Sequence, residues 1–181
     1  MDKPQARSWA KARRKTLDQQ ALGSAMAQAL LALPAWQQAN AVLCFAALPD
    51  EPDTTPILRA ALAQGKQLFL PRVAPERALH WVPVTDLAAL QRSSYGILEP
   101  TGEPAPLPEQ GVLGLIPCLA ASPQGVRLGR GGGYYDRFLP QFRGNLMLLC
   151  PTALLAEDLP CEAWDFRFAP QQILTEHGLL G

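Results

Sequence analysis

The sequence has little charge, little histidine and no long apolar run. Only 18% of its 181 residues are charged, and 16 basic side chains balance 16 acidic ones, so the formal net charge is zero. A surface that binds duplex nucleic acid needs a net basic face. No apolar run approaches the length of a membrane span, and the basic N-terminus lacks the apolar segment of a secretory signal. We therefore expect a cytoplasmic protein with no nucleic-acid partner and no membrane partner.

Cysteine and histidine are too few and too scattered for a predicted zinc site. The chain has two histidines and four cysteines, and the cysteines form no CxxC pair. Three of the cysteines lie in or beside apolar runs, which predicts buried free thiols in a reducing compartment. The four cysteines are Cys44, Cys118, Cys150 and Cys161, and the two histidines are His80 and His177.

The composition is that of a globular protein with a real core. Apolar residues make up 48% of the chain, and the length fits one domain over residues 1–181. We expect this domain to act as a monomer or a weak homodimer.

Apolar segments of strand length alternate with segments of helical spacing. Helices are expected over residues 3–15, from an N-cap at Asp18 to Pro34, from a cap at Thr55 to Gly65, and over 134–142. Strands are expected at 40–48, 66–73, 78–84, 111–117 and 145–151. Because most of these strands are apolar without alternation, the sheet should be buried on both faces. The pattern predicts an α/β fold, a three-layer sandwich whose mainly parallel central sheet is flanked by helices.

A glycine-rich stretch, "GVRLGRGGGYYDRF", follows one of these strands at the end where α/β proteins bind ligands. Gly129, Gly131, Gly132 and Gly133 allow backbone N–H groups to converge on an anion. Arg127 and Arg130 add charge in a form that suits phosphate. Asp136 has the wrong sign for a phosphate unless a cation such as magnesium lies between them.

Other interpretations of this stretch stay open at the level of the residues. The glycines on their own are also typical of a tight strand-to-helix connection. No Lys-Ser/Thr pair follows, so the stretch is not a Walker A loop, and it does not open a first βαβ unit as a Rossmann fingerprint does. A single "RGGG" among aromatic residues is also unlike the repeated, disordered RGG segments that bind RNA.

Taken together, the motifs resemble the 5-formyltetrahydrofolate cyclo-ligase family. "RLGRGGGYYDRFL" is similar to the family signature, and Lys3 with Arg7 resembles its N-terminal Lys-x-x-x-Arg. The stretches "LPDEPDT", "LFLPRV", "YGILEP" and "LPCEAWDFRF" follow in the family's order over nearly the whole chain. Four positions depart from the usual pattern, namely Cys118, Ser122, Gly132 and Trp164.

The resemblance implies ATP and Mg²⁺ as cofactors and 5-formyltetrahydrofolate as substrate. It implies that Arg130 and Tyr134 are catalytic and that Asp136 and Asp165 hold the metal. The implied ATP-binding residues are Lys3, Arg7, Arg127, Leu128, Gly129, Arg130, Gly131, Gly132, Gly133, Tyr134 and Tyr135. The implied substrate-binding residues are Glu51, Arg7, Arg130, Gly131, Gly132, Gly133 and Tyr134.

Each of these side chains also has a purely structural interpretation. Lys3 and Arg7 could form a solvated helix face, and Glu51 could be a hydrated loop carboxylate. Asp136 could be a favourable charge at a helix N-terminus, and Asp165 a loop cap. Tyr135 is expected to pack, and Trp81 to lie in the core.

The implied reaction is an ATP-dependent ring closure that gives 5,10-methenyltetrahydrofolate, ADP and phosphate. Phosphorylation turns the formyl oxygen into a leaving group, so the enzyme has to supply positioning and charge stabilisation, not a nucleophile. Two alternatives remain at this stage. One is another ATP-dependent ligase or kinase on the same scaffold, and the other is a non-catalytic binder of folate or nucleotide.

Overall fold

The structure is a computed structural model, and it describes residues 1–94 and 96–181. Tyr95, the first residue of the "YGILEP" motif, lies outside the described residues. The α-helices are α1 (Lys3–Arg14), α2 (Gln19–Leu31), α3 (Pro34–Gln38), α4 (Thr55–Ala63) and α5 (Tyr134–Phe138). The main strands are β1 (Ala41–Leu43), β2 (Gln67–Val73), β3 (Leu79–Val84), β6 (Val112–Pro117), β9 (Asn145–Leu149), β10 (Ile173–Thr175) and β11 (Gly178–Leu179).

These strands form one mixed sheet in the order β11-β10-β9-β6-β1-β2-β3. The four central pairings, from β10 through β9, β6 and β1 to β2, are parallel. The strands at the two edges, β3 and β11, are antiparallel to their neighbours. Two small ribbons are separate from this sheet, β4 (Gln91–Arg92) with β5 (Leu98–Glu99) and β7 (Ala120–Ala121) with β8 (Arg127–Leu128). The predicted α/β fold with a mainly parallel sheet is confirmed.

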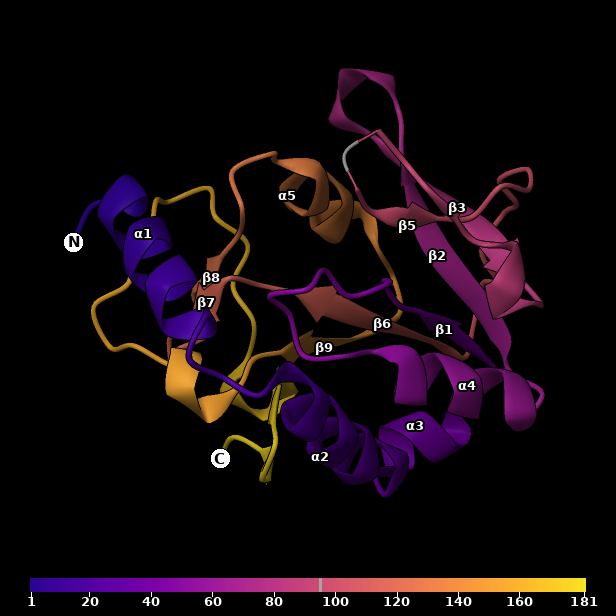
Figure 1. The fold of residues 1–181 in the computed structure, drawn as a ribbon, viewed down its shortest axis with the longest axis horizontal. Coiled ribbons are helices and arrows are strands. Elements are labelled where there is room, and N and C mark those ends of the chain that lie inside the picture. Colours follow the sequence, from indigo (N-terminus) through magenta and orange to yellow (C-terminus); the bar gives the residue numbers. More distant parts are fainter. Residues whose placement is uncertain (95) are drawn as a thin grey trace.

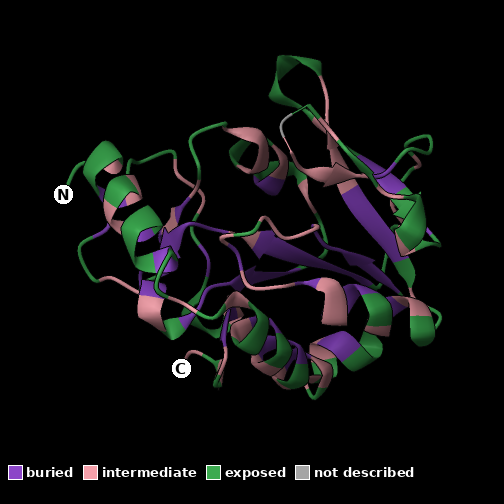
Figure 2. Cartoon of the chain, in the orientation of Figure 1, coloured by how far each residue is buried: buried purple, intermediate pink, exposed green. Residues whose placement is uncertain are grey.

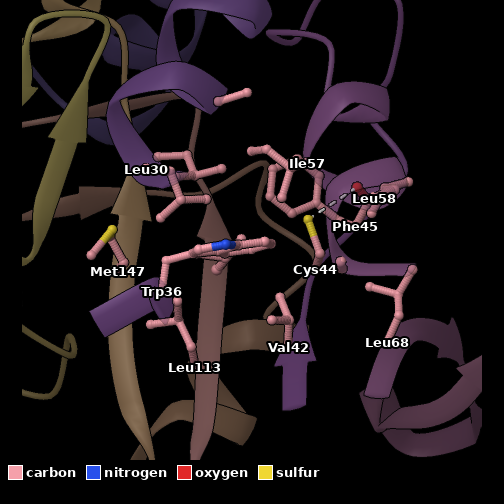
Figure 3. Packing of buried hydrophobic residues seen from close by; sticks show 14 of the residues in the cluster. Leu30, Trp36, Val42, Cys44, Phe45, Ile57, Leu58, Leu68, Leu113 and Met147 are labelled. Atoms are coloured by element: carbon pink, nitrogen blue, oxygen red, sulfur yellow. Dashed lines mark hydrogen bonds between the residues drawn. The ribbon is translucent and has the colours of Figure 1, made fainter. Parts of the chain in front are cut away.

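Helices cover both faces of the sheet (Figure 1). On one face α2, α3 and α4 pack their apolar side chains onto the strands, around the buried Trp36 (Figure 3). On the other face α1 and α5 pack onto the same strands. Neighbouring residues of β9, such as Met147 and Leu148, therefore point into different core clusters, yet both are buried. Burial on both faces explains why these strands are continuous apolar runs (Figure 2).

Local signals set the helix ends, with one correction. Asp2 and Gln5 form a capping box that starts α1, and Asp18 caps α2 as predicted. The predicted cap at Thr55 is wrong by one residue, because Thr54 is the N-cap of α4. The hydroxyl of Thr54 is used elsewhere: it donates to the carbonyl of Phe45 and accepts from the N–H of Ala47.

The first predicted strand is shorter than expected. Residues 40–48 were predicted to be extended throughout, but β1 ends at Leu43. Beyond it the backbone takes side-chain partners instead of a full ladder, from Thr54 and from Glu51, whose Oε2 accepts from the N–H of Leu48 at 3.0 Å. The early end of β1 therefore produces the loop that carries Asp50 and Glu51.

Three cysteines are buried free thiols, as predicted. Cys44, Cys118 and Cys150 lie in the core, and Cys161 is partly exposed. Burial raises the pKa of the Cys44 thiol to about 12, which keeps it protonated. Within residues 1–94 and 96–181, no helix is long and apolar enough to cross a membrane.

Candidate active site

The glycine stretch forms a tight loop between β8 and α5. Gly131 has φ +98° and Gly133 has φ +76°, a backbone region that side-chain-bearing residues rarely adopt. Gly133 is also the N-cap of α5, which is five residues long and continues into a short 3₁₀ helix over Leu139–Gln141. The helix predicted over residues 134–142 is therefore in the right place, but it consists of a five-residue α-helix followed by a 3₁₀ helix.

A pocket of about 250 Å³ lies along this loop, and its lining is mainly apolar. Most of the predicted site residues line it, namely Glu51, Arg127 and residues 129–136. Leu128 lies between these residues, but its side chain is buried in the core. The structure thus brings the acidic loop after β1 and the glycine loop before α5 together around one pocket, although they are far apart in the sequence.

Arg130 is held by two carboxylates of the acidic loop. Its Nη2 lies 2.6 Å from Oδ1 of Asp50 and 2.9 Å from Oε1 of Glu51, and its Nε donates to the same Glu51 oxygen at 3.1 Å. Burial by itself would lower the pKa of Arg130, but the hydrogen bond to Asp50 and the charge of Glu51 outweigh it and raise that pKa. Burial would likewise raise the pKa of Asp50, and the bond to Arg130 lowers it overall. Both groups are therefore charged at neutral pH.

Glu51 is a buried carboxylate with both oxygens in use. Oε2 accepts from the N–H of Leu48, and Oε1 accepts from Arg130. The prediction singled out Glu51 but not its neighbour Asp50. The adjacent acids in "LPDEPDT" were a signal for two carboxylates at this place, but only the fold shows that both face the same arginine.

Arg14, the last residue of α1, was not among the predicted site residues, but it holds two segments that border the candidate site. It is 2% exposed, and its guanidinium donates to the carbonyls of Cys118, Leu119 and Asp50. These carbonyls belong to the segment after β6 and to the acidic loop, so Arg14 ties the two segments together. Lys3, Arg7 and Arg14 are spaced so that they share one face of α1. This spacing is the feature of the sequence that could have pointed to Arg14.

Arg7 extends from α1 to the glycine loop. Its Nε donates to the carbonyl of Gly129 at 3.0 Å, and a Cβ placed on Gly131 would lie 3.3 Å from its Cζ. Lys3, one turn earlier, does not reach the lining of the pocket as the structure describes it. Its Nζ lies instead 2.8 Å from Glu162 and 2.9 Å from Asp165.

Arg127 joins the start of the glycine loop to the end of β6 and to α5. Its side chain is 7% exposed, its Nε donates to the carbonyl of Pro117, and its guanidinium stacks over the ring of Tyr135. Burial raises the pKa of Tyr135, whose ring also packs against two core clusters, as the packing interpretation expected. Trp81 is likewise buried, 5.1 Å from Phe138 between ring centroids.

The two predicted metal ligands have different surroundings. Asp136 lines the pocket with a side chain that is 54% exposed, and one of its oxygens lies 3.2 Å from Nη1 of Arg127. Asp165 is bonded to Lys3 and to the N–H of Glu162. Burial would raise the pKa of Asp165, but these hydrogen bonds lower it. Among the described residues there is no group of three or more His, Cys, Asp or Glu side chains that could hold a metal by themselves.

Comparisons with known proteins identify the family of the chain. A sequence model of the 5-formyltetrahydrofolate cyclo-ligase family matches residues 2–176. The 5-formyltetrahydrofolate cyclo-ligase of Escherichia coli K12 is 29% identical over 155 residues, covering 81% of this chain and 85% of its own length. The mouse enzyme of the same name is 33% identical over 123 residues, covering 63% of this chain and 60% of its own.

Solved structures give the same result. The 5,10-methenyltetrahydrofolate synthetase of Aquifex aeolicus superposes with a TM-score of 0.83 at 28% identity, covering 99% of this chain and 92% of its own. A structure of the synthetase from Mycoplasma pneumoniae, at 19% identity and a TM-score of 0.73, supports the fold alone. The class of protein is therefore an enzyme, a ligase of folate metabolism. The chain belongs to the 5-formyltetrahydrofolate cyclo-ligase family.

Proposed function

We propose that the chain catalyses the ATP- and Mg²⁺-dependent cyclisation of 5-formyltetrahydrofolate to 5,10-methenyltetrahydrofolate, with release of ADP and phosphate. The observation that carries the proposal is the single pocket in which the glycine loop and Arg130 meet the buried Glu51. A phosphate loop and a buried carboxylate are the two features needed to bind a nucleotide beside a reduced pterin.

The reaction has two chemical steps. The formyl oxygen attacks the γ-phosphorus of ATP, so that a C–O–P linkage forms as the bond to ADP breaks. The N10 amine then attacks the activated carbon, a C–N bond forms, N10 loses its proton to solvent, and the oxygen leaves with the phosphate. Both steps demand positioning and stabilisation of negative charge, and neither requires a covalent enzyme intermediate.

Arg130 is the proposed stabiliser of the transferring phosphoryl group. Its fork of donors suits phosphate oxygens, and Asp50 and Glu51 hold the guanidinium at the wall of the pocket. Glu51 is proposed to accept N–H groups from the pterin edge, and Tyr134, which lines the same pocket, to orient the formyl group. Arg7 is proposed to bind the nucleotide phosphates from the α1 side, and Lys3 would join it only after leaving Glu162 and Asp165.

Asp136 fits a magnesium ligand better than Asp165 does. Magnesium is usually held by one or two carboxylates together with substrate phosphates, and Asp136 is an exposed carboxylate beside the phosphate-binding loop. When bound, the ion would neutralise charge on the phosphate oxygens. Asp165 could join it only after giving up contacts with Lys3.

The proposal is tested by following the absorbance of the methenyl product. The signal should appear only when ATP, magnesium and 5-formyltetrahydrofolate are all present, with one ADP and one phosphate formed per turnover. Formation of AMP and pyrophosphate would show that the γ-phosphoryl mechanism is wrong. ATP turnover with other acceptors but not with this folate would assign the chain to a different reaction on the same scaffold.

A further inference from the structure

A second hollow, of about 490 Å³, adjoins the pocket of the candidate site. The two share Val73, Glu99 and Tyr134 in their linings. The other described walls of the hollow come from residues 74–77, in the turn between β2 and β3, and from Ser93 and Ser94. A ligand that fills the site pocket can therefore extend past Tyr134 into this hollow without crossing the core.

Arg77 projects from the β2–β3 turn toward the glycine loop. A Cβ placed on Gly133 would lie 3.6 Å from Nη1 of Arg77. A Cβ placed on Gly131 would lie similarly close to Arg7, 3.3 Å from its Cζ. Guanidinium groups from α1 and from the β2–β3 turn thus flank the same loop on two sides. Glu76 and Arg77 both have φ near +60°, which is uncommon for residues other than glycine. Arg137 holds this turn in place, because its Nη1 donates to the carbonyl of Glu76 at 3.0 Å.

Arg77 differs from the other cations around the loop in having no partner within the described part of the chain. Arg130 and Arg127 each have an acidic partner, and the Nε of Arg7 donates to a backbone carbonyl. Arg77 is exposed, and no hydrogen bond or ion pair joins it to residues 1–94 or 96–181. Its five N–H donors are therefore available to an anionic group of a ligand.

The other charged residues that line the hollow indicate which kind of anionic group Arg77 would bind. Glu76 and Glu99 line it together with Arg77. A polyphosphate carries only acceptors and several negative charges, so two carboxylates would oppose its binding. A glutamyl group carries a carboxylate for Arg77 and an amide N–H for a carboxylate oxygen. One oxygen of Glu99 accepts from the N–H of Val73 at 3.4 Å, and the other is available for such an amide.

We propose that this hollow binds the glutamyl tail of the folate substrate and that Arg77 binds a carboxylate of that tail. The proposal rests on the proposed function, because it assumes a folate whose pterin lies toward Glu51. Apolar residues such as Leu79, Ile97 and Leu98 line the pocket beside the shared wall and suit the flat aromatic ring that joins pterin and tail. Arg77 is thus a residue that sets specificity for the tail, separate from the phosphate-binding residues.

The test compares Arg77→Gln with the wild type on two substrates, 5-formyltetrahydrofolate and its analogue without the glutamate, 5-formyltetrahydropteroate. For the glutamate-bearing substrate the variant should raise KM by about five- to tenfold, the loss expected for one charged contact that is partly exposed to water. The kcat and the KM for ATP should be unchanged. With the truncated substrate, variant and wild type should be equal, and Arg77→Lys should recover part of the loss.

Arg59→Gln is the matched control, because Arg59 is an exposed arginine of α4, on the other face of the sheet. It should leave every constant unchanged. A higher KM for ATP in Arg77→Gln would assign Arg77 to the phosphates, and an equal loss on both folates would assign it to the shape of the loop. Either result overturns the proposal.

Direct binding separates this proposal from the proposed function. If the wild type turned over neither folate, the proposed function would fail, but calorimetric titration with the two compounds would still test the hollow. Arg77→Gln should weaken binding of the glutamate-bearing compound by about the same five- to tenfold and leave the truncated compound unaffected. Equal affinities of wild type and variant for the glutamate-bearing compound would show that the tail lies elsewhere.

Discussion

Two ion-pair clusters in this protein have the same layout and different surroundings. In the acidic-loop cluster, Arg130 lies between Asp50 and Glu51, at 2.6 and 2.9 Å. In the terminal cluster, Lys3 lies between Glu162 and Asp165, at 2.8 and 2.9 Å. Each cluster places one cation between two carboxylates from a distant part of the chain.

The clusters differ in burial and in their relation to the pocket. The Glu51 side chain is 8% exposed, whereas that of Glu162 is 46% exposed. Arg130 and Glu51 line the pocket, and the described lining includes no member of the terminal cluster. Because charges interact more strongly where water is excluded, the acidic-loop cluster should govern the chemistry. The terminal cluster should mainly hold the start of α1 against the C-terminal loop, with a modest effect on stability.

The largest effect is expected for Arg130→Ala. The variant should lower kcat by about a hundredfold or more, the scale of losing an electrostatic stabiliser of the transition state. Arg130→Lys should recover only part of the activity, because a point charge replaces a planar fork. Steady-state kinetics with thermal melts of each variant measure this. An unchanged kcat with a weaker KM for ATP would reassign Arg130 to ground-state binding.

Asp136→Asn tests the exposed carboxylate that belongs to neither cluster. If Asp136 binds magnesium, activity at limiting magnesium should fall by about tenfold or more and recover partly at high magnesium by mass action. The free energy of unfolding without ligands should change little, because the pair with Arg127 is exposed on the Asp136 side. A variant that is less stable by about 0.5–1 kcal/mol, with a magnesium dependence equal to the wild type, would make Asp136 a helix-terminal charge instead.

Lys3→Gln breaks the terminal cluster and should have a smaller effect. The free energy of unfolding should fall by less than about 1 kcal/mol, the range of pairs open to water. Lys11→Gln, an exposed residue of α1, is the control for the loss of one positive charge on that helix. Chemical denaturation measures both variants. A loss of about 3 kcal/mol or more, typical of a broken buried pair, would remove the distinction between the two clusters.

The smallest effect is expected at acid pH. The pKa values of Asp50 and Asp165 both lie below the ordinary 3.8 in the folded protein. Their ionised forms therefore favour folding, and this stabilisation is present above pH 4 or so and is lost as the pH falls through the folded pKa values. Asp50→Asn and Asp165→Asn should each flatten the acid side of the stability curve. Curves parallel to the wild type below about pH 4 would contradict the lowered pKa values.

The sequence by itself determined most of the regular structure and the place of the glycine loop. Long elements such as α2 and β9 have a clear hydrophobic period or an apolar run, and both are where the pattern predicts them. Gly131, Gly133 and their charged neighbours are a local signal, so the loop was identifiable before its surroundings were known. Two- and three-residue strands such as β7 and β10 carry too few residues for any period to show.

Only the tertiary structure decided what the charges of the site face. Arg130 pairs with acids 79 and 80 positions away, and nothing near Arg130 in the sequence specifies them. Nor does the local sequence place Arg77 beside Gly133, because that approach depends on how the β2–β3 turn bends over α5. The physical reason is that helices, strands and tight turns depend on neighbours along the chain. Ion pairs, buried arginines such as Arg14 and pocket walls depend on which distant segments the core packs together.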